Sequence, residues 1–283
     1  MIAAYAQLAS AMILVGANVP VGKLLAAALP VPMILFLRCL LACLVLASLG
    51  PIARPARAAG WNLALQALFG TVLYNVALLA GLRRTGALEA GLVLASLPAV
   101  VAIGAALFLR ERLTLRSCLA VLLAAGGMAT LASARPTTAG TLAGDALVFA
   151  AVCGEAAYVL LAKRNSGRLG IVAATFWMQV ASATLLLPFA VPAVSRTVLT
   201  WHLTGLLVFH GLTASVLAVL LWYNGLKRVP AAVAGVFTGL LPLTAGVLAI
   251  GLLGETPDAS QGIGAVLLLG SIAAATTRQG RRP

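Results

Sequence analysis

Apolar runs of about twenty residues recur along the whole chain of 283 residues, and they limit its possible folds more than any other feature. A helix needs roughly 20 apolar residues to cross the hydrocarbon core of a bilayer. Hydrophobic residues make up 62% of the chain and charged residues 9%, whereas about 45–50% and 25% are usual in soluble domains. A folded soluble protein cannot bury so large an apolar share. The sequence therefore predicts an all-α integral membrane protein.

Ten segments are long and apolar enough to be transmembrane helices. We expect them over residues 4–27, 32–49, 61–82, 86–109, 115–133, 144–162, 170–190, 203–226, 230–253 and 260–277. The connections between them are short and leave no room for a soluble catalytic domain. No basic segment of a cleaved signal peptide precedes the first span, so we expect this span to be retained.

The basic residues are distributed unequally between alternate connections. If the N-terminus is cytoplasmic, thirteen lie on the inner side and five on the outer side. Short cytoplasmic loops carry an excess of Lys and Arg, so we expect both termini in the cytoplasm. Arg supplies 16 of the 19 basic residues, which together with the excess of Ala and Leu suggests a GC-rich bacterial genome. The net charge of +13 is too dispersed for a nucleic-acid surface, and no nucleic-acid partner is expected.

An internal repeat relates the two halves of the chain. Shifting the sequence by 144 residues lays the third, fourth and fifth spans on the last three without a gap: residues 81–84 (Gly-Leu-Arg-Arg) fall on 225–228 (Gly-Leu-Lys-Arg), and Leu97-Pro98 on Leu241-Pro242. Glu111 falls on Glu255, thirteen residues after the proline in both halves. A shift of 140 relates the first two spans to the sixth and seventh less strongly. We predict five-helix repeats over residues 1–139 and 140–283.

Five is an odd number, so two such repeats must cross the membrane in opposite directions. Inverted repeats are typical of secondary transporters, whose substrate site lies near the midplane between the halves. The fold predicted is therefore ten transmembrane helices arranged as two inverted five-helix repeats, and the function predicted is transport by alternating access.

With these motifs, the sequence resembles the EamA-type module of the drug/metabolite transporter superfamily. The resemblance rests on the Gly-Leu-basic-basic run, the helical proline thirteen residues before a glutamate, and the glycine in each final helix (Gly126 and Gly270). It implies a ten-helix exporter of small metabolites in the bacterial inner membrane, with amino acids, including aromatic ones, as the best-known cargo. These motifs are structural, so they do not identify the substrate.

Matched features of the fourth and ninth spans suggest that these two helices line the cavity. Small residues recur at four-residue intervals in both spans, which favours close packing. Pro98 and Pro242 each remove a backbone donor, so we expect both helices to bend near mid-membrane. Ser96 and Thr238 lie close to these bends and are cavity candidates.

Two charged residues lie inside predicted spans, where a charge is costly and often functional. Glu155 is the deepest carboxylate, and it could couple transport to protons, contact a cationic substrate group, bond to a neighbouring helix or pair with Arg38. Arg38 could extend to the outer interface, form an ion pair or contact a substrate carboxylate.

Polar and aromatic side chains complete the candidate site. Asn18, Tyr74, Asn75, Tyr158 and Trp177 lie nearer mid-membrane and are expected to line the cavity. His210 is a second coupling candidate, although a buried histidine is more often simply hydrogen-bonded. Trp222 and Tyr223 lie near a helix end, where we expect them to anchor the interface.

The chain lacks the features of competing functions. It has two histidines and no His-Glu-x-x-His motif, no Gly-x-Ser-x-Gly, no paired aspartates and no phosphate-binding loop, so neither an intramembrane enzyme nor an ATP-driven pump is expected. A channel would show a continuous polar stripe. We predict a carrier of small metabolites, and amino acids are the substrate class expected first. No cofactor or metal is expected, and a monomer is the working assumption. A drug, sugar or nucleotide carrier of the same fold is the main alternative.

Overall fold

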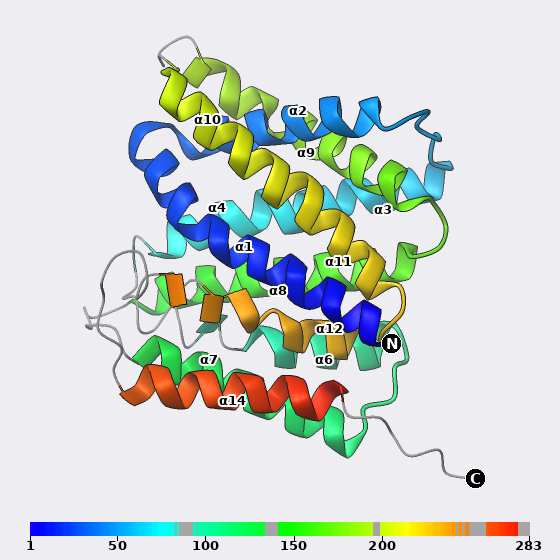
Figure 1. Ribbon diagram of the computed structural model, residues 1–283, viewed down its shortest axis with the longest axis vertical. Helices are drawn as coiled ribbons and strands as arrows, with labels where there is room; N and C mark the ends of the chain where they lie inside the picture. Colours follow the sequence, from blue (N-terminus) through cyan, green and yellow to red (C-terminus); the bar gives the residue numbers. More distant parts are fainter. Residues whose placement is uncertain are drawn as a thin grey trace.

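The computed structural model describes residues 1–82, 84, 93–94, 96–133, 141–194, 199–241, 243–244, 247–248 and 259–276, and every regular element in these ranges is a helix (Figure 1). Six stretches are long and apolar enough to cross a membrane: Ile2–Ala26, Val31–Ser48, Arg57–Gly81, Leu142–Asn165, Ile171–Pro192 and Trp201–Leu226. Leu97–Phe108, Leu115–Thr130 and Gly262–Thr276 are shorter apolar helices. The chain is a multi-pass membrane protein, and the expected total of ten crossings goes beyond what these residues establish.

The helices divide into two sets along the chain. The first set is α1 (Ile2–Ala28), α2 (Val31–Ser48), α3 (Arg57–Ala67), α4 (Tyr74–Leu82), α6 (Leu97–Phe108) and α7 (Leu115–Ser133). The second set is α8 (Leu142–Asn165), α9 (Ile171–Val194), α10 (Trp201–His210), α11 (Ala218–Leu226), α12 (Ala231–Phe237) and α14 (Ala259–Thr276). Two π-helical segments, η1 (Leu68–Leu73) and η2 (Gly211–Leu217), join α3 to α4 and α10 to α11.

The 144-residue offset carries helix boundaries of the first set onto those of the second. It places the start of α3 on the start of α10, and α4 (Tyr74–Leu82) on α11 (Ala218–Leu226). It also places η1 on residues 212–217, inside η2. Because π-helical segments are rare, their presence at equivalent positions is strong support for a duplicated architecture.

Repeat-related helices run in opposite directions through the bundle (Figure 1). In this view α1 runs from right to left and α8 from left to right, and α7 and α14 are likewise opposed. The beginning of α1 and the end of α14 lie at the same end of the bundle.

Four pairs of helices, each with one helix from either half, make the main contacts between the described parts of the two halves. α2 packs against α9, α7 against α14, α4 against α8 and α1 against α11. Glycines allow the close contacts of α4 with α8 and of α1 with α11. A Cβ on Gly81 would lie 3.0 Å from the carbonyl oxygen of Gly144, and one on Gly225 would lie 2.9 Å from that of Ala4. These four positions correspond through the 144- and 140-residue offsets, so the two helix pairs use the same packing.

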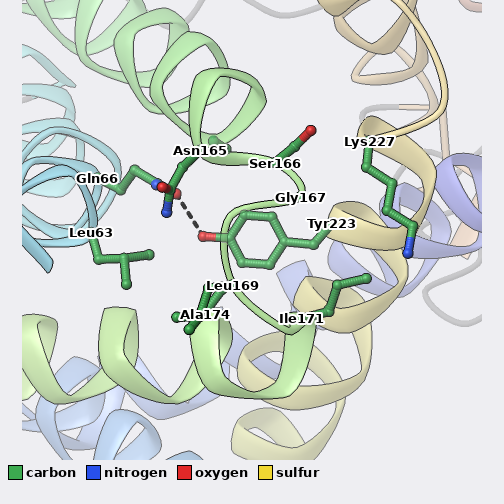
Figure 2. A pocket seen from close by; sticks show the side chains of 11 residues that line it. Leu63, Gln66, Asn165, Ser166, Gly167, Leu169, Ile171, Ala174, Tyr223 and Lys227 are labelled. Atoms are coloured by element: carbon green, nitrogen blue, oxygen red, sulfur yellow. Dashed lines mark hydrogen bonds between the residues drawn. The ribbon is translucent and has the colours of Figure 1, made fainter. Parts of the chain in front are cut away.

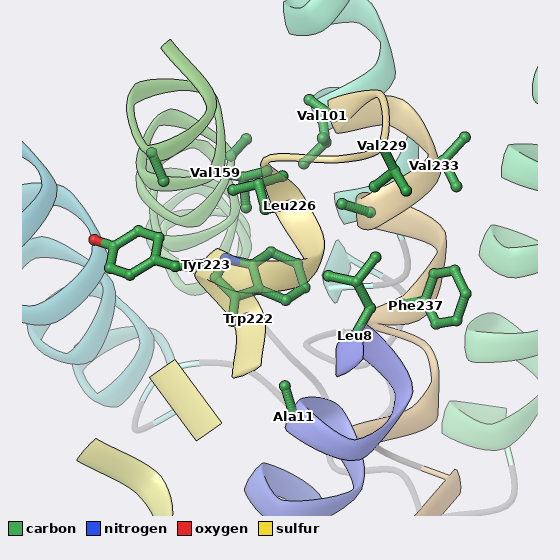
Figure 3. Packing of buried hydrophobic residues seen from close by; sticks show 14 of the residues in the cluster. Leu8, Ala11, Val101, Val159, Trp222, Tyr223, Leu226, Val229, Val233 and Phe237 are labelled. Atoms are coloured by element: carbon green, nitrogen blue, oxygen red, sulfur yellow. The ribbon is translucent and has the colours of Figure 1, made fainter. Parts of the chain in front are cut away.

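The main apolar cluster lies where helices from both halves meet. It includes Leu8 of α1, Val101 of α6, Val159 of α8, Leu226 of α11 and Phe237 of α12 (Figure 3). Elsewhere large apolar side chains such as those of Leu44, Leu122, Phe189 and Val266 point outward and are exposed. An apolar outer surface of this kind is suited to contact with lipid.

The fourth and ninth spans are interrupted rather than smoothly bent. α12 ends at Phe237, and a turn follows in which the N–H of Thr238 donates to Gly235 O (3.2 Å) and that of Gly239 to Val236 O (3.2 Å). These three-residue bonds replace the four-residue bonds of an α-helix. The prediction of one continuous helix over residues 230–253 is therefore wrong at this point.

The prediction that Pro98 bends the interior of a helix is also wrong. A turn at Ser96, whose N–H donates to Val93 O (3.0 Å), precedes α6, and Pro98 lies in the first turn of that helix. Proline is tolerated there because the first N–H groups of a helix have no partner within it. Pro242, its repeat equivalent, lies outside the described residues.

Candidate substrate-binding site

Glu155 lies near the middle of α8 and has no partner in the part of the chain that the structure describes. Its side chain is half-buried, and no hydrogen bond or ion pair joins it to a described residue. The expected alternative of a pair with Arg38 is not formed, because the guanidinium of Arg38 contacts His210 instead. The hydroxyl groups of Tyr74 and Tyr158 are close enough to interact electrostatically with the Glu155 carboxyl group. A carboxylate and two phenols from α4 and α8 thus lie together between the halves.

Two glycines bring α8 against η1 and so position this cluster. A Cβ on Gly154 would lie 3.0 Å from the carbonyl oxygen of Phe69, and one on Gly70 would lie 2.8 Å from Cγ of Tyr158. The absence of side chains at these positions allows the backbone of η1 to approach α8 closely. Tyr158 therefore lies over the π-helical segment, on the same face of α8 as Glu155.

The polar groups of η1 are partly satisfied by side chains. The Asn75 amide donates to Thr71 O (2.6 Å), and the Thr71 hydroxyl lies 3.2 Å from that of Ser182 in α9. A π-turn changes the regular pattern of backbone hydrogen bonds. The Asn75 side chain supplies a hydrogen bond to one carbonyl of this turn, that of Thr71. One side-chain N–H of Asn75, a predicted cavity residue, is thus already used within its own helix.

A second polar cluster joins three candidates that lie far apart in the sequence. The imidazole of His210 lies with Nδ1 3.0 Å from Asn18 Oδ1 and with Nε2 3.4 Å from Arg38 Nη1. Asn18 also donates to Thr213 Oγ1 (2.8 Å) in η2. The structure therefore brings Asn18, Arg38 and His210 together between α1, α2 and α10.

A third polar cluster contains Tyr223, whose position in the sequence predicts an anchor at the membrane interface. The hydroxyl of Tyr223 donates to Gln66 Oε1 (2.6 Å) and lies 3.2 Å from Met178 Sδ. Tyr223 and Trp222 are 7% and 4% exposed, so the prediction that they anchor the membrane interface is wrong. For Trp222 a signal existed, because Gly225 lies three residues later and therefore marks the packed face of the helix.

The third cluster borders a pocket at one end of the bundle (Figure 2). The pocket is partly open to solvent and has a cavity volume of about 20 Å³, and its lining includes Gln66, Tyr223, Asn165 and Lys227. The side-chain oxygen of Asn165 is buried without a hydrogen-bond partner. The pocket thus offers an unused acceptor beside a tyrosine and an amide, at the end of the bundle where Lys163 and Lys227 lie.

Three other cavity candidates use their polar atoms locally. The hydroxyls of Ser96 and Thr238 donate to backbone oxygens three residues earlier, each at 2.6 Å. The indole N–H of Trp177 donates to Ala53 O (3.0 Å) in the connection between α2 and α3. Ser96 and Thr238 therefore belong to the helix interruptions, and Trp177 is held at one end of the bundle rather than near its middle.

Two oppositely charged side chains hold the connection between α11 and α12. Lys163, at the end of α8, donates to Leu226 O (2.8 Å) and to Val229 O. Glu111, before α7, accepts hydrogen bonds from the N–H groups of Ala231 (2.8 Å) and Ala232 (3.3 Å). A cation at carbonyls that end one helix and a carboxylate at the first N–H groups of the next are the favourable arrangements at helix ends. Glu111 therefore joins the first half to α12.

No metal centre is apparent among the residues in the described ranges, where no three His, Cys, Asp or Glu side chains are close enough to share an ion.

Comparison with known proteins identifies the family. The model of the EamA-like transporter family matches residues 2–133 and again residues 142–277. The chain belongs to this family. The two matches correspond to the two sets of helices, so the two-repeat architecture of EamA-like transporters is present, and membership of the drug/metabolite transporter superfamily fits.

Two further comparisons agree with this assignment. The chain is 32% identical over 284 residues to "Uncharacterized transporter YetK" of Bacillus subtilis (strain 168), covering 95% of this chain and 85% of that protein. A solved structure described only as "Crystal structure of protein" superposes with a TM-score of 0.79 over 95% of each chain at 20% identity, and this likeness concerns the fold alone. The protein is thus a membrane transporter of small molecules rather than an enzyme.

Proposed function

We propose that this EamA-like transporter is a secondary carrier that exports amino acids with uncharged side chains, aromatic ones included, across the bacterial inner membrane. In this proposal the chain crosses the membrane ten times as two inverted repeats, residues 1–139 and 140–283, with both termini in the cytoplasm. The two repeats exchange their packings, so that the site between them opens alternately to either side. Export and the choice of amino acids rest on the family resemblance.

The observation that carries the proposal is the Glu155 carboxyl group, which has no ion-pair partner in the described ranges and lies beside Tyr74 and Tyr158. Ionisable groups inside a membrane are rare and are often found on substrate or proton pathways. A carboxylate with neighbouring phenols is suited to bind an ammonium group, or to carry a proton between the two sides. Apolar walls with a few polar groups suit a small amphipathic substrate.

The first test is counterflow. The purified protein is placed in liposomes preloaded with unlabelled amino acid, and entry of radiolabelled amino acids is measured across a panel without an ion gradient. We expect saturable counterflow for members with uncharged side chains. If none of the amino acids exchanges but a sugar, a nucleotide or a lipophilic cation does, the cargo proposed here is wrong. Single-channel conductance would overturn the carrier mechanism.

The role of Glu155 is tested by E155Q, with C153A as the matched control on the exposed side of the same helix. If the carboxylate binds the substrate ammonium group, E155Q loses both counterflow and gradient-driven uptake. If it carries a proton, E155Q keeps counterflow and loses only the uptake driven by a proton gradient. Unchanged behaviour in both assays would remove Glu155 from the mechanism.

The orientation has a separate test. A reporter enzyme that is active only in the cytoplasm is fused to the C-terminus, and activity is expected. Activity only of a reporter that functions outside the cytoplasm would contradict the topology inferred from the basic residues.

A further inference from the structure

Arg38 is a cation inside the membrane without an anion among the described residues. Its guanidinium contacts His210, with Nη1 3.4 Å from Nε2, and its buried Nε atom has no hydrogen-bond partner in the described structure. A guanidinium has five N–H donors and no acceptor. A charge without a counter-ion at this depth costs free energy, and charged residues inside a membrane are therefore usually functional.

The position of Arg38 does not fit a side chain that simply extends to the membrane surface. In the apolar helical stretches Ile2–Ala26, Val31–Ser48 and Trp201–Leu226, the residues Asn18, Arg38 and His210 lie seven to nine residues from the nearest end, or roughly 10–14 Å along the helix axis. His210 is 8% exposed and Asn18 is 3% exposed. The guanidinium is therefore held against buried partners between α1, α2 and α10.

The hydrogen bonds around His210 have one consistent direction. Since arginine cannot accept a hydrogen bond, Nε2 of His210 accepts from Arg38, and Nδ1–H donates to Asn18 Oδ1 (3.0 Å). The Asn18 amide in turn donates to Leu14 O and Thr213 Oγ1, each at 2.8 Å. The imidazole is therefore neutral. The described residues around Arg38 fix the guanidinium in place and supply no negative charge.

The other half of the protein shows that this cluster is not required by the fold. Through the repeat offsets, Arg38 corresponds to Met178 and His210 corresponds to Gln66. At this repeat-related place, which also joins the two halves, the hydroxyl of Tyr223 bonds to Gln66 and Met178, and all three groups are neutral. The same architecture thus packs with an uncharged set at the equivalent place. The positive charge is an addition to one half only.

We propose that Arg38, positioned by His210, Asn18 and Thr213, is the subsite that binds the carboxylate of the transported substrate. This inference deepens the proposed function and rests on it. Guanidinium groups bind carboxylates through two parallel hydrogen bonds, and the unused N–H groups of Arg38 include the buried Nε. The proposed function assigns the opposite charge, for the ammonium group of the substrate, to Glu155 of α8.

The test compares three probes that differ only at their charged ends: L-leucine, L-leucinamide and 4-methylpentanoate. Competition with counterflow is measured for wild type and for R38M, which places at position 38 the residue that the other half carries. We expect R38M to weaken competition by leucine by about 10-fold or more, because a charge-assisted hydrogen bond is lost. Competition by leucinamide should be unchanged. R38K should lie between wild type and R38M, since it keeps the charge but loses the paired geometry.

R164Q is the charge-matched control, because it removes an exposed cation at the end of α8. It should leave the preference for leucine over leucinamide unchanged. If R38M and wild type show the same preference, the subsite is refuted while amino-acid transport stands. A binding measurement identifies the opposite outcome, in which the anion site exists but amino acids are not transported. If 4-methylpentanoate raises the thermal stability of wild type but not of R38M, while no amino acid exchanges, the anion site stands and the amino-acid cargo is wrong.

A lipid phosphate is the competing anion. Wild type and R38M are therefore compared in vesicles of phosphatidylcholine alone and in vesicles with added phosphatidylglycerol. Stabilisation by the anionic lipid that disappears in R38M, with an unchanged leucine preference, would assign Arg38 to the lipid and overturn the proposal.

Discussion

Replacement of Gly70 by alanine tests whether η1 and α8 are in contact as closely as the structure indicates. A Cβ at this position would lie 2.8 Å from Cγ and 2.9 Å from both Cβ and Cδ2 of Tyr158. Carbon atoms rest about 3.5–4.0 Å apart, so the ring or the helix must shift by roughly 0.6–1.2 Å. These are atoms at the base of the side chain, which cannot move away without moving α8.

The expected magnitude follows from two opposing terms. Overpacking of this kind costs about 1–3 kcal/mol, whereas the change from glycine to alanine inside a helix gains about 1 kcal/mol. Gly205 is the matched control, because no atom lies within 4 Å of its Cβ position. G205A therefore keeps the gain alone, and the free energy of unfolding should differ between the two variants by about 1–3 kcal/mol.

Thermal unfolding of the purified protein, followed by the fluorescence of its four tryptophans, measures this difference. We expect G70A to unfold several degrees below G205A, since about 2–4 °C corresponds to 1 kcal/mol in chains of 150–250 residues. Equal midpoints would refute the close contact. A double variant, Gly70→Ala with Tyr158→Asn, copies the repeat-related residues Ala214 and Asn18, and it should recover part of the loss.

Three further outcomes are expected. E111A removes the acceptor for the first two N–H groups of α12 and should lower stability by about 1–2 kcal/mol, with faster proteolysis between α11 and α12 as a second readout; unchanged proteolysis would mean that this connection does not depend on the carboxylate. G81A and G225A should lower the unfolding midpoint by similar amounts, because each places a Cβ within 3.0 Å of a backbone oxygen on the opposing helix; a loss in only one of them would contradict equivalent packing. H210Q should reduce the preference for leucine over leucinamide by less than removal of the Arg38 guanidinium does, because it loosens the guanidinium without removing it, and an unchanged preference would show that His210 does not position Arg38.

The spans and the duplication could be predicted because both depend on patterns along the chain. Apolar runs of helical length mark the crossings, and the gapless offset from Gly81 to Gly225 marks the repeat. The matched π-helical segments then follow from the repeat, although no residue pattern announced them. These features need no knowledge of which helices are neighbours.

The site could be predicted only as a set of residues at a certain depth. Distance from a helix end gives depth but not the side of the helix that faces the protein. Depth alone therefore predicts an interfacial position for Tyr223, which is in fact buried. The contact of Arg38 with His210 joins residues 172 positions apart, and it depends on the packing of α2 against η2. The interruption before Pro98 likewise depends on backbone bonds that proline alone does not determine.

The pairing of helices across the two halves has a consequence for synthesis. The main neighbour of α1 is α11, that of α2 is α9 and that of α7 is α14, so the helices made first have their partners in the part made last. Contacts between distant parts of a chain form slowly, and incomplete intermediates expose surfaces that misassemble. The first helices must therefore stay in the bilayer as separate, lipid-solvated segments during translation. For α1, Gly225 arrives only after more than two hundred residues have been added, so the bundle can close only near the end of synthesis.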